Sequence, residues 1–150
     1  PMGRRGFTFI EILIVMILIG IIAAIGFPRL RGVVETNNVR GARAGIATLV
    51  ATGRAAAVQR GCRATLHFTS GTDGTVWLTV CKVNAAGLDT LGGVERIASR
   101  FNVTFTATRD SLSFDPRGLG TNYVVTTLQF TAGGVKDSVM INQVGKVVRQ

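Results

Sequence analysis

The longest unbroken run of hydrophobic positions lies close to the start of the chain. Twenty-one consecutive residues, from Phe7 to Phe27, contain only two polar side chains, Thr8 and Glu11. As a helix that rises about 1.5 Å per residue, this run is roughly 30 Å long, which matches the hydrocarbon core of a bilayer. The pattern therefore predicts a membrane-spanning helix segment over residues 7–28. A carboxylate inside such a segment costs on the order of 3 kcal/mol, so Glu11 is expected to have a partner and a purpose.

Beyond Pro28 the apolar positions keep a helical spacing but lie on one face only. Gly61 is a stop signal, so an amphipathic helix is predicted over residues 29–60. Its apolar stripe is rich in small residues, which favours a sheet packed closely against it. This stripe consists of Val39, Ala42, Ile46, Leu49, Val50, Gly53 and Ala57. Pro28 removes one backbone hydrogen bond and disfavours a helical Phe27, so a kink or local melting is expected there.

From residue 62 the period of the pattern changes to two. Residues 62–68 alternate apolar and polar side chains, a turn signal follows at 70–74, and residues 75–82 form a second candidate strand. These two segments predict a β-hairpin.

The register of this hairpin bears on the two cysteines. Centring the turn between Gly71 and Thr72 places Cys62 directly opposite Cys81, and Trp77 opposite Leu66. Opposed residues of a non-hydrogen-bonded pair have Cα atoms about 4.5–5.5 Å apart, which is within disulfide range. A Cys62–Cys81 disulfide is therefore predicted. Two buried free thiols are the alternative, and they would be the better interpretation in a cytosolic protein.

The rest of the chain continues as short alternating segments. In residues 101–108 apolar and polar positions alternate strictly, as in a half-buried strand. A turn is predicted at 115–118 and a flexible loop at 84–93. Further strands are predicted over 111–114, 122–131, 135–142 and after Gly145. The pattern as a whole predicts an α+β fold, in which one long N-terminal helix packs on an antiparallel β head over residues 62–150.

Charge narrows the range of partners. The formal net charge is +9. Arg4 and Arg5 precede the hydrophobic run and Glu11 is the only ionisable side chain inside it, so the part beyond Pro28 carries +8. This excess favours anionic surfaces such as acidic proteins, lipid head groups or nucleic acid.

The sequence offers no catalytic constellation. His67 is the sole histidine, and the alternation places it on the face opposite Leu66, away from the predicted core. No serine or cysteine has a recognisable base. Asp110 and Asp115 lack the ligand-dense loop of a calcium site, and a turn already explains Asp115. We therefore predict no enzyme activity, no cofactor and no metal site.

Four features at the N-terminus carry a family resemblance. The chain begins with a short basic stub over residues 1–6 that ends in Gly6; Phe7 follows, Glu11 comes four residues later, and Pro28 falls near the end of the apolar run. In these features the chain resembles the type IV pilins and the pseudopilins of type II secretion. An ordinary membrane anchor with an incidental acid is the alternative.

The resemblance implies how the chain is processed and placed. In this superfamily a prepilin peptidase cleaves after the leader glycine and methylates the new amino terminus, which here implies Gly6 and Phe7 as the processing site. Arg29 and Arg31 follow the apolar run as Arg4 and Arg5 precede it, so the flanking charges do not decide the topology. The family resemblance decides it: it implies that the leader is cytoplasmic and that residues 29–150 form a periplasmic domain of a bacterial inner-membrane protein.

The β head narrows the resemblance further. Residues 53–61, residues 113–118 and the closing order of strand, Gly145 and basic strand are similar to the H-type minor pseudopilins and the FimT-type minor pilins, which share one domain family (GspH/FimT). This similarity implies a structural subunit that initiates or caps a periplasmic filament of a type II secretion system or type IV pilus. In such a filament Glu11 would pair with the amino terminus of Phe7 in a neighbouring subunit. The implied partners are other pilin-like subunits, the prepilin peptidase, the inner-membrane assembly platform and membrane lipid.

A second function stays open at this point. Some FimT-like proteins bind DNA through a basic C-terminal segment, and the counterpart here contains Lys146 and Arg149. A solvated edge strand that is protected by its charges explains the same residues, and we favour that explanation.

Overall fold

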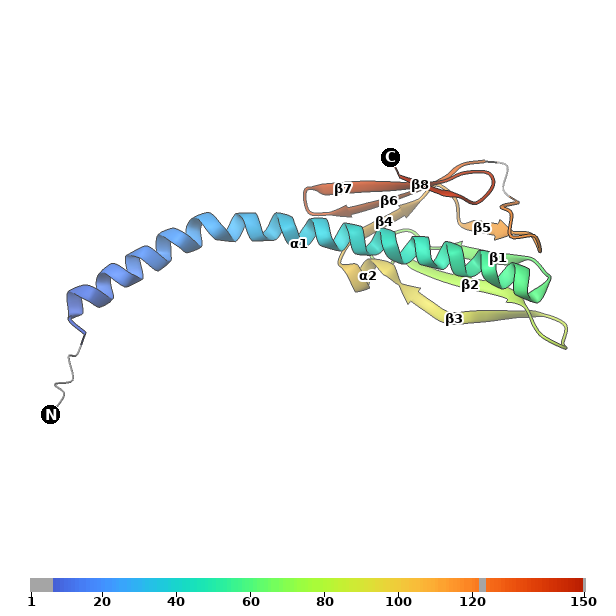
Figure 1. Cartoon of the computed structure of the whole chain (residues 1–150), viewed down its shortest axis with the longest axis horizontal. Coiled ribbons are helices and arrows are strands. Elements are labelled where there is room, and N and C mark those ends of the chain that lie inside the picture. The colour runs from blue at the N-terminus through green and yellow to red at the C-terminus, as the bar shows by residue number, and fades with distance from the viewer. Residues whose placement is uncertain (1–6, 122–123, 150) are drawn as a thin grey trace. The chain divides into compact units, whose positions relative to one another are not determined.

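The computed structural model describes residues 7–121 and 124–149, with the side chain of Arg149 outside the described part. A single helix, α1 (Phe9–Arg60), opens the chain, and strands and one short helix follow it (Figure 1). Contacts divide the chain into a unit that ends at Val34 and a compact unit that begins at Glu35. The end of α1 at Arg60 confirms the predicted end of the helix.

The first unit consists of the apolar half of α1. This helix is long and apolar enough to cross a membrane. The backbone stays helical through Phe27 and Pro28. Local melting, one of the two expected effects of Pro28, is therefore not found, because the remaining hydrogen bonds of the helix hold its geometry across the proline. A kink at Pro28 stays a prediction.

The second unit contains two four-stranded antiparallel sheets. Sheet A has the order β3 (Leu88–Arg96), β2 (Thr75–Cys81), β1 (Ala64–Phe68) and β5 (Ser111–Phe114). Sheet B has the order β4 (Thr104–Ala107), β6 (Thr126–Ala132), β7 (Val135–Ile141) and β8 (Val147–Arg149). The short helix α2 (Ile97–Phe101) connects β3 to β4, and the second half of α1 packs against the sheets (Figure 1).

The core forms where the predicted apolar stripe of α1 meets the sheets. Every stripe residue except Leu49 is buried, and Leu49 packs at the edge of the core. Gly53 shows why the stripe has small residues. A Cβ at this position would lie 3.2 Å from Leu78 and 3.3 Å from Phe114, so glycine lets the helix backbone approach sheet A closely. The expected packing of a sheet against this half of the helix is thus confirmed.

Two expectations about the strands are wrong. Residues 84–93 were expected to be a loop, but β3 begins at Leu88 and pairs with β2. The strand contains a bulge in which Gly92 and Gly93 adopt positive φ. These small residues are typical of a loop, but here they belong to the bulge of an irregular strand. Phe101 was expected to begin a strand, but it ends α2, and its ring lies against Gly41 of α1.

The predicted hairpin register is also wrong by one step. Leu66 pairs with Leu78 and His67 pairs with Trp77. Trp77 therefore lies beside His67 on the outer face of sheet A, and Leu66 and Leu78 face the core together. The register differs because the connection after Phe68 is an irregular turn that also bonds to Phe105, not a symmetric two-residue turn.

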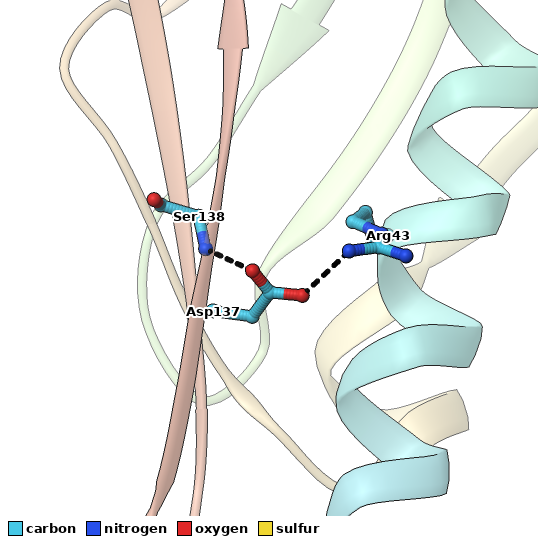
Figure 2. A network of polar contacts seen from close by, with 3 residues as sticks. All are labelled: Arg43, Asp137 and Ser138. Atoms are coloured by element: carbon cyan, nitrogen blue, oxygen red, sulfur yellow. Dashed lines mark hydrogen bonds and ion pairs between the residues drawn. The ribbon is translucent and has the colours of Figure 1, made fainter. Parts of the chain in front are cut away.

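Polar contacts fasten sheet B to α1 across long sequence separations. Arg43 on α1 donates to Asp137 on β7 at 2.9 Å, and the other carboxylate oxygen of Asp137 accepts from the backbone N–H of Ser138 at 2.8 Å (Figure 2). One turn before the start of the buried stripe, Glu35 accepts from the backbone N–H of Gly134 in the β6–β7 turn. Both contacts hold the β6–β7 hairpin to the helix.

Candidate functional site

The N-terminus of α1 brings together two of the residues that the sequence singled out. Thr8 immediately precedes the helix, and Glu11 is the third residue inside it. The side chain of Glu11 accepts from the backbone N–H of Thr8 at 3.4 Å, and the hydroxyl of Thr8 accepts from the backbone N–H of Glu11 at 3.4 Å. This reciprocal arrangement is a capping box.

The capping box has a physical purpose in an apolar environment. The first N–H groups of a helix have no partner within it, and a bilayer offers no water to replace one. Thr8 and Glu11 satisfy two of these donors and hold the Glu11 carboxylate at the extreme end of the helix. The role of Thr8 was missed in the sequence, although the spacing Thr-x-x-Glu before an apolar run is the signal that could have indicated it.

The predicted processing site borders this end of the helix. Gly6 lies outside the described residues, while Phe7 is described and is 81% exposed. The apolar side chains that follow are exposed as well, and this surface extends past Pro28 to Leu30, Val33 and Val34. A helix that exposes apolar side chains around its whole circumference needs a lipid or protein environment.

The cysteines form the predicted disulfide. Cys62 and Cys81 are bonded with their Cα atoms 6.3 Å apart. The reason differs from the predicted one, because Cys62 lies in the turn that ends α1 and not in the β1–β2 ladder. Its backbone N–H donates to Ala57, and Arg60 donates to the carbonyl of Cys81 at 2.9 Å. The bond therefore joins the end of the helix to the end of β2.

The C-terminal basic residues lie at an edge of sheet B. Lys146 belongs to the turn before β8, where its backbone N–H donates to the side chain of Asn142 at 2.7 Å, and its own side chain is exposed. Arg149 ends β8, which pairs only with β7 and so forms an edge of the sheet. This placement agrees with the edge-strand interpretation of both residues.

The described residues contain no cluster of three or more His, Cys, Asp or Glu side chains that could hold a metal ion. His67 lies on the outer face of sheet A, where its Nε2 is 2.9 Å from the hydroxyl of Thr79. Burial lowers the pKa of His67 below its ordinary value of 6.5. Ser111 on β5 is the register partner of His67, and both cysteines are used in the disulfide.

Comparisons with known families match both parts of this architecture. Residues 1–27 match the prokaryotic N-terminal methylation motif. Residues 42–145, which include the last part of α1 and the strands β1 to β7, match the family Type II transport protein GspH. The chain belongs to the GspH family. It is a minor pseudopilin or minor pilin, as the resemblance implied, and its pilin-like fold is α+β.

Solved structures agree with this assignment at the level of the fold. The type IV minor pilin FimU of Pseudomonas aeruginosa strain PAO1, in a crystal form of space group P21, has a TM-score of 0.61 at 14% identity, covering 77% of this chain and 90% of that chain. A second FimU crystal form, in space group P65, has a TM-score of 0.57 at 14% identity, covering 74% of this chain and 91% of that chain. No curated protein matches the chain.

The GspH family and the fold are those of structural pilins. An apolar N-terminal helix in such a protein fits anchoring in the inner membrane and incorporation into a filament together with other pilin subunits. The comparisons give no support to the DNA-binding alternative.

Proposed function

We propose that this GspH-family chain is a structural subunit that initiates or caps a periplasmic filament, and that it acts through assembly and not through catalysis. The description of the matched family favours a type II secretion system over a type IV pilus as the machinery. In this proposal residues 29–150 lie in the periplasm, and the inner-membrane assembly platform moves the subunit from the membrane into the filament.

The observation that carries the proposal is the position of the Glu11 carboxylate. It lies at the first turn of an exposed apolar helix and contacts the backbone of Thr8, the second residue after the proposed cleavage site. Cleavage between Gly6 and Phe7 by a prepilin peptidase would create a positively charged amino terminus next to this carboxylate position. Methylation of that amine keeps its charge.

Assembly then follows from the cost of an unpaired charge in an apolar environment. A lone Glu11 in the bilayer is unfavourable, and pairing it with the Phe7 amine of a neighbouring subunit offsets this cost. The capping box supports the pairing, because it orders the helix end before the neighbour arrives. The apolar side chains from Phe9 to Phe27 would pack helix against helix in the filament and face lipid before assembly.

Replacement of Glu11 tests this proposal. The Glu11→Ala variant should insert into the membrane normally, yet its incorporation into sheared filament fractions should fall by about tenfold or more, because breaking a buried ion pair costs several kcal/mol. The Thr8→Ala variant is the matched control, because it loses half of the capping box but keeps the carboxylate, and its incorporation should fall much less. Normal incorporation of Glu11→Ala would contradict the proposal.

A further inference from the structure

The outer face of sheet A carries two rows of side chains that run across all four strands. Register partners in an antiparallel sheet point to the same side, so each row can be followed from strand to strand. The inward-facing partners of the same strands, such as Leu66, Leu78 and Leu112, are buried in the core. The first row is Ser111, His67, Trp77 and Val94, and the second is Ser113, Thr65, Thr79 and Thr90. We call these eight residues the outer face.

The outer face has no side chain that is charged at neutral pH. This is unusual in a domain that carries +8, because solvent-facing sheet surfaces commonly have charged residues. His67 is no exception, since burial lowers its pKa and keeps the ring neutral near pH 7. The next row on the same side of the sheet, beyond Trp77 and Val94, contains a charged residue, because Arg96 lies opposite Thr75 there. An uncharged centre beside a charged border is the typical composition of a protein–protein interface.

Four polar side chains at the centre of the outer face, Thr65, Ser113, Thr79 and His67, have partners within it. The hydroxyls of Thr65 and Ser113 are 3.0 Å apart, and the hydroxyl of Thr79 lies 2.9 Å from His67 and also donates to the carbonyl of Thr65. A second surface can therefore cover these groups without leaving them unpaired, which removes the main penalty of burying polar side chains.

The first row also has side chains of a kind that can supply binding energy in an interface. The rings of His67 and Trp77 are stacked, with centroids 5.0 Å apart and an interplanar angle of 13°. Beside them, on the edge strand β3, Val94 is 59% exposed. Tryptophan is among the residues that most often dominate the binding energy of an interface, and here it lies between a stacked ring and an exposed aliphatic side chain.

These properties favour one class of partner over the others. Nucleic acid and anionic lipid head groups need cations, which the outer face lacks. A glycan would stack on a free ring face and bond to free hydroxyls, but one face of the Trp77 ring is covered by His67, and the hydroxyls of Thr65, Ser113 and Thr79 already have partners. A second copy of this chain would bring another domain of +8 against the first. The class of partner that remains is a different protein that presents an uncharged surface.

We propose that the outer face of sheet A docks against the head domain of a neighbouring, different pilin-like subunit that presents an uncharged surface. The inference rests on the proposed function, because it requires that the chain lie beside such subunits in a filament. It adds a contact between heads to the contact between helices that Glu11 mediates. The head contact would select which subunit stands next to this one, since it depends on the complementarity of two particular surfaces.

Photo-crosslinking in the producing bacterium tests this assignment with the full chain. A photoreactive amino acid is placed at Val94 in the outer face, at Gln129 as a matched exposed position on sheet B, and at Ile14 in the apolar half of α1. We expect adducts from Val94 and Ile14, but not from Gln129, and mass spectrometry should identify the Val94 partner as a different chain with its own N-terminal methylation motif.

The outcomes separate the inference from the proposed function. Adducts from Ile14 without any from Val94, or equal adducts from Val94 and Gln129, would overturn the outer-face assignment alone. A Val94 adduct with glycan, nucleic acid, lipid or a second copy of the chain would also overturn it. Failure at both Ile14 and Val94 would contradict the proposed function as well. As a second measurement, Val94→Arg should reduce co-purification of the crosslinked partner by about tenfold, whereas Gln129→Arg should leave it unchanged.

Discussion

Arg43 on α1 and Asp137 on β7 form an ion pair at 2.9 Å, although 94 residues separate them in the chain. Both side chains are mostly shielded from solvent, with exposed fractions of 25% and 19%. The contact joins α1 to β7 of sheet B (Figure 2). We therefore expect this ion pair to stabilise the packing of sheet B against α1.

Loss of this pair should destabilise the head. The Arg43→Ala variant leaves a partly buried carboxylate without its cation, and we expect the free energy of unfolding to fall by about 1–2 kcal/mol in urea denaturation. Arg40→Ala is the matched control, because Arg40 is exposed on the same helix, and it should change stability by less than about 0.5 kcal/mol. Equal stability of Arg43→Ala and wild type would show that the pair contributes nothing.

The turn between β7 and β8 should be intolerant of side chains at Gly145. This residue has φ of +78°, and a Cβ would lie 2.7 Å from the ring of Phe114. The Gly145→Ala variant should therefore lose roughly 2–3 kcal/mol from backbone strain and overpacking. Gly134→Ala is the control, because a Cβ at Gly134 would meet no atom within 4 Å. Thermal melts of both variants test this: the melting temperature of Gly145→Ala should fall, and that of Gly134→Ala should stay close to wild type. Equal decreases would show a general effect of replacing glycine.

The single histidine allows a direct measurement of its pKa. Because burial lowers the pKa of His67 in the folded protein, the unfolded chain binds a proton more readily. The stability that this neutral histidine contributes is complete above the unfolded pKa of about 6.5 and decreases as the pH falls below it. An NMR titration should place the pKa of His67 below 6.5, and His67→Gln should reduce the loss of stability on acidification. A measured pKa above 6.5 would contradict the burial of this side chain.

Removal of the disulfide should loosen the junction between α1 and β2. The bond closes a loop with a sequence separation of 19 residues, so Cys62→Ala combined with Cys81→Ala should cost about 3 kcal/mol in the chain-entropy model. Arg60 would still donate to the carbonyl of residue 81, so the fold should persist. Alkylation of the unreduced wild type should find no free thiol, and reaction of both cysteines would contradict the bond.

Much of the architecture could be predicted because its signals are local. The apolar run from Phe7, the helical stripe that ends near Ala57 and the strict alternation of the later strands each follow from side-chain period. The stop at Gly61 also followed from a local signal. The acid within the apolar run indicated a site at Glu11, but the partner that the structure provides, Thr8, was missed because the expected partner lay in another subunit.

What could not be predicted depends on contacts between distant segments. The register of β1 and β2 is set by the burial of Leu66 and Leu78 together against α1, which no turn signal reveals. The Cys62–Cys81 pairing was correct even though the register was not, since Cys62 precedes the paired residues of β1. In the same way, β3 was not predicted because Gly92 and Gly93 are typical of a loop. Their bulge belongs to a strand only because β2 provides a hydrogen-bonding partner.

Assembly through Glu11 depends on a processed N-terminus. If Gly6 and Phe7 form the cleavage site, the chain isolated from filament fractions begins at Phe7 and has one added methyl group on its amine. The Gly6→Leu variant should keep residues 1–6 and be absent from those fractions, although it is still present in the membrane.

Intact-mass spectrometry of the chain from membranes and from sheared filaments, for wild type and Gly6→Leu, is therefore the most direct test. The proposed assembly predicts a methylated chain starting at Phe7 in wild-type filaments and only the uncleaved, unmethylated chain for the variant, confined to the membrane. Filaments that contain the uncleaved Gly6→Leu chain would contradict it, because no Phe7 amine would then exist to pair with Glu11.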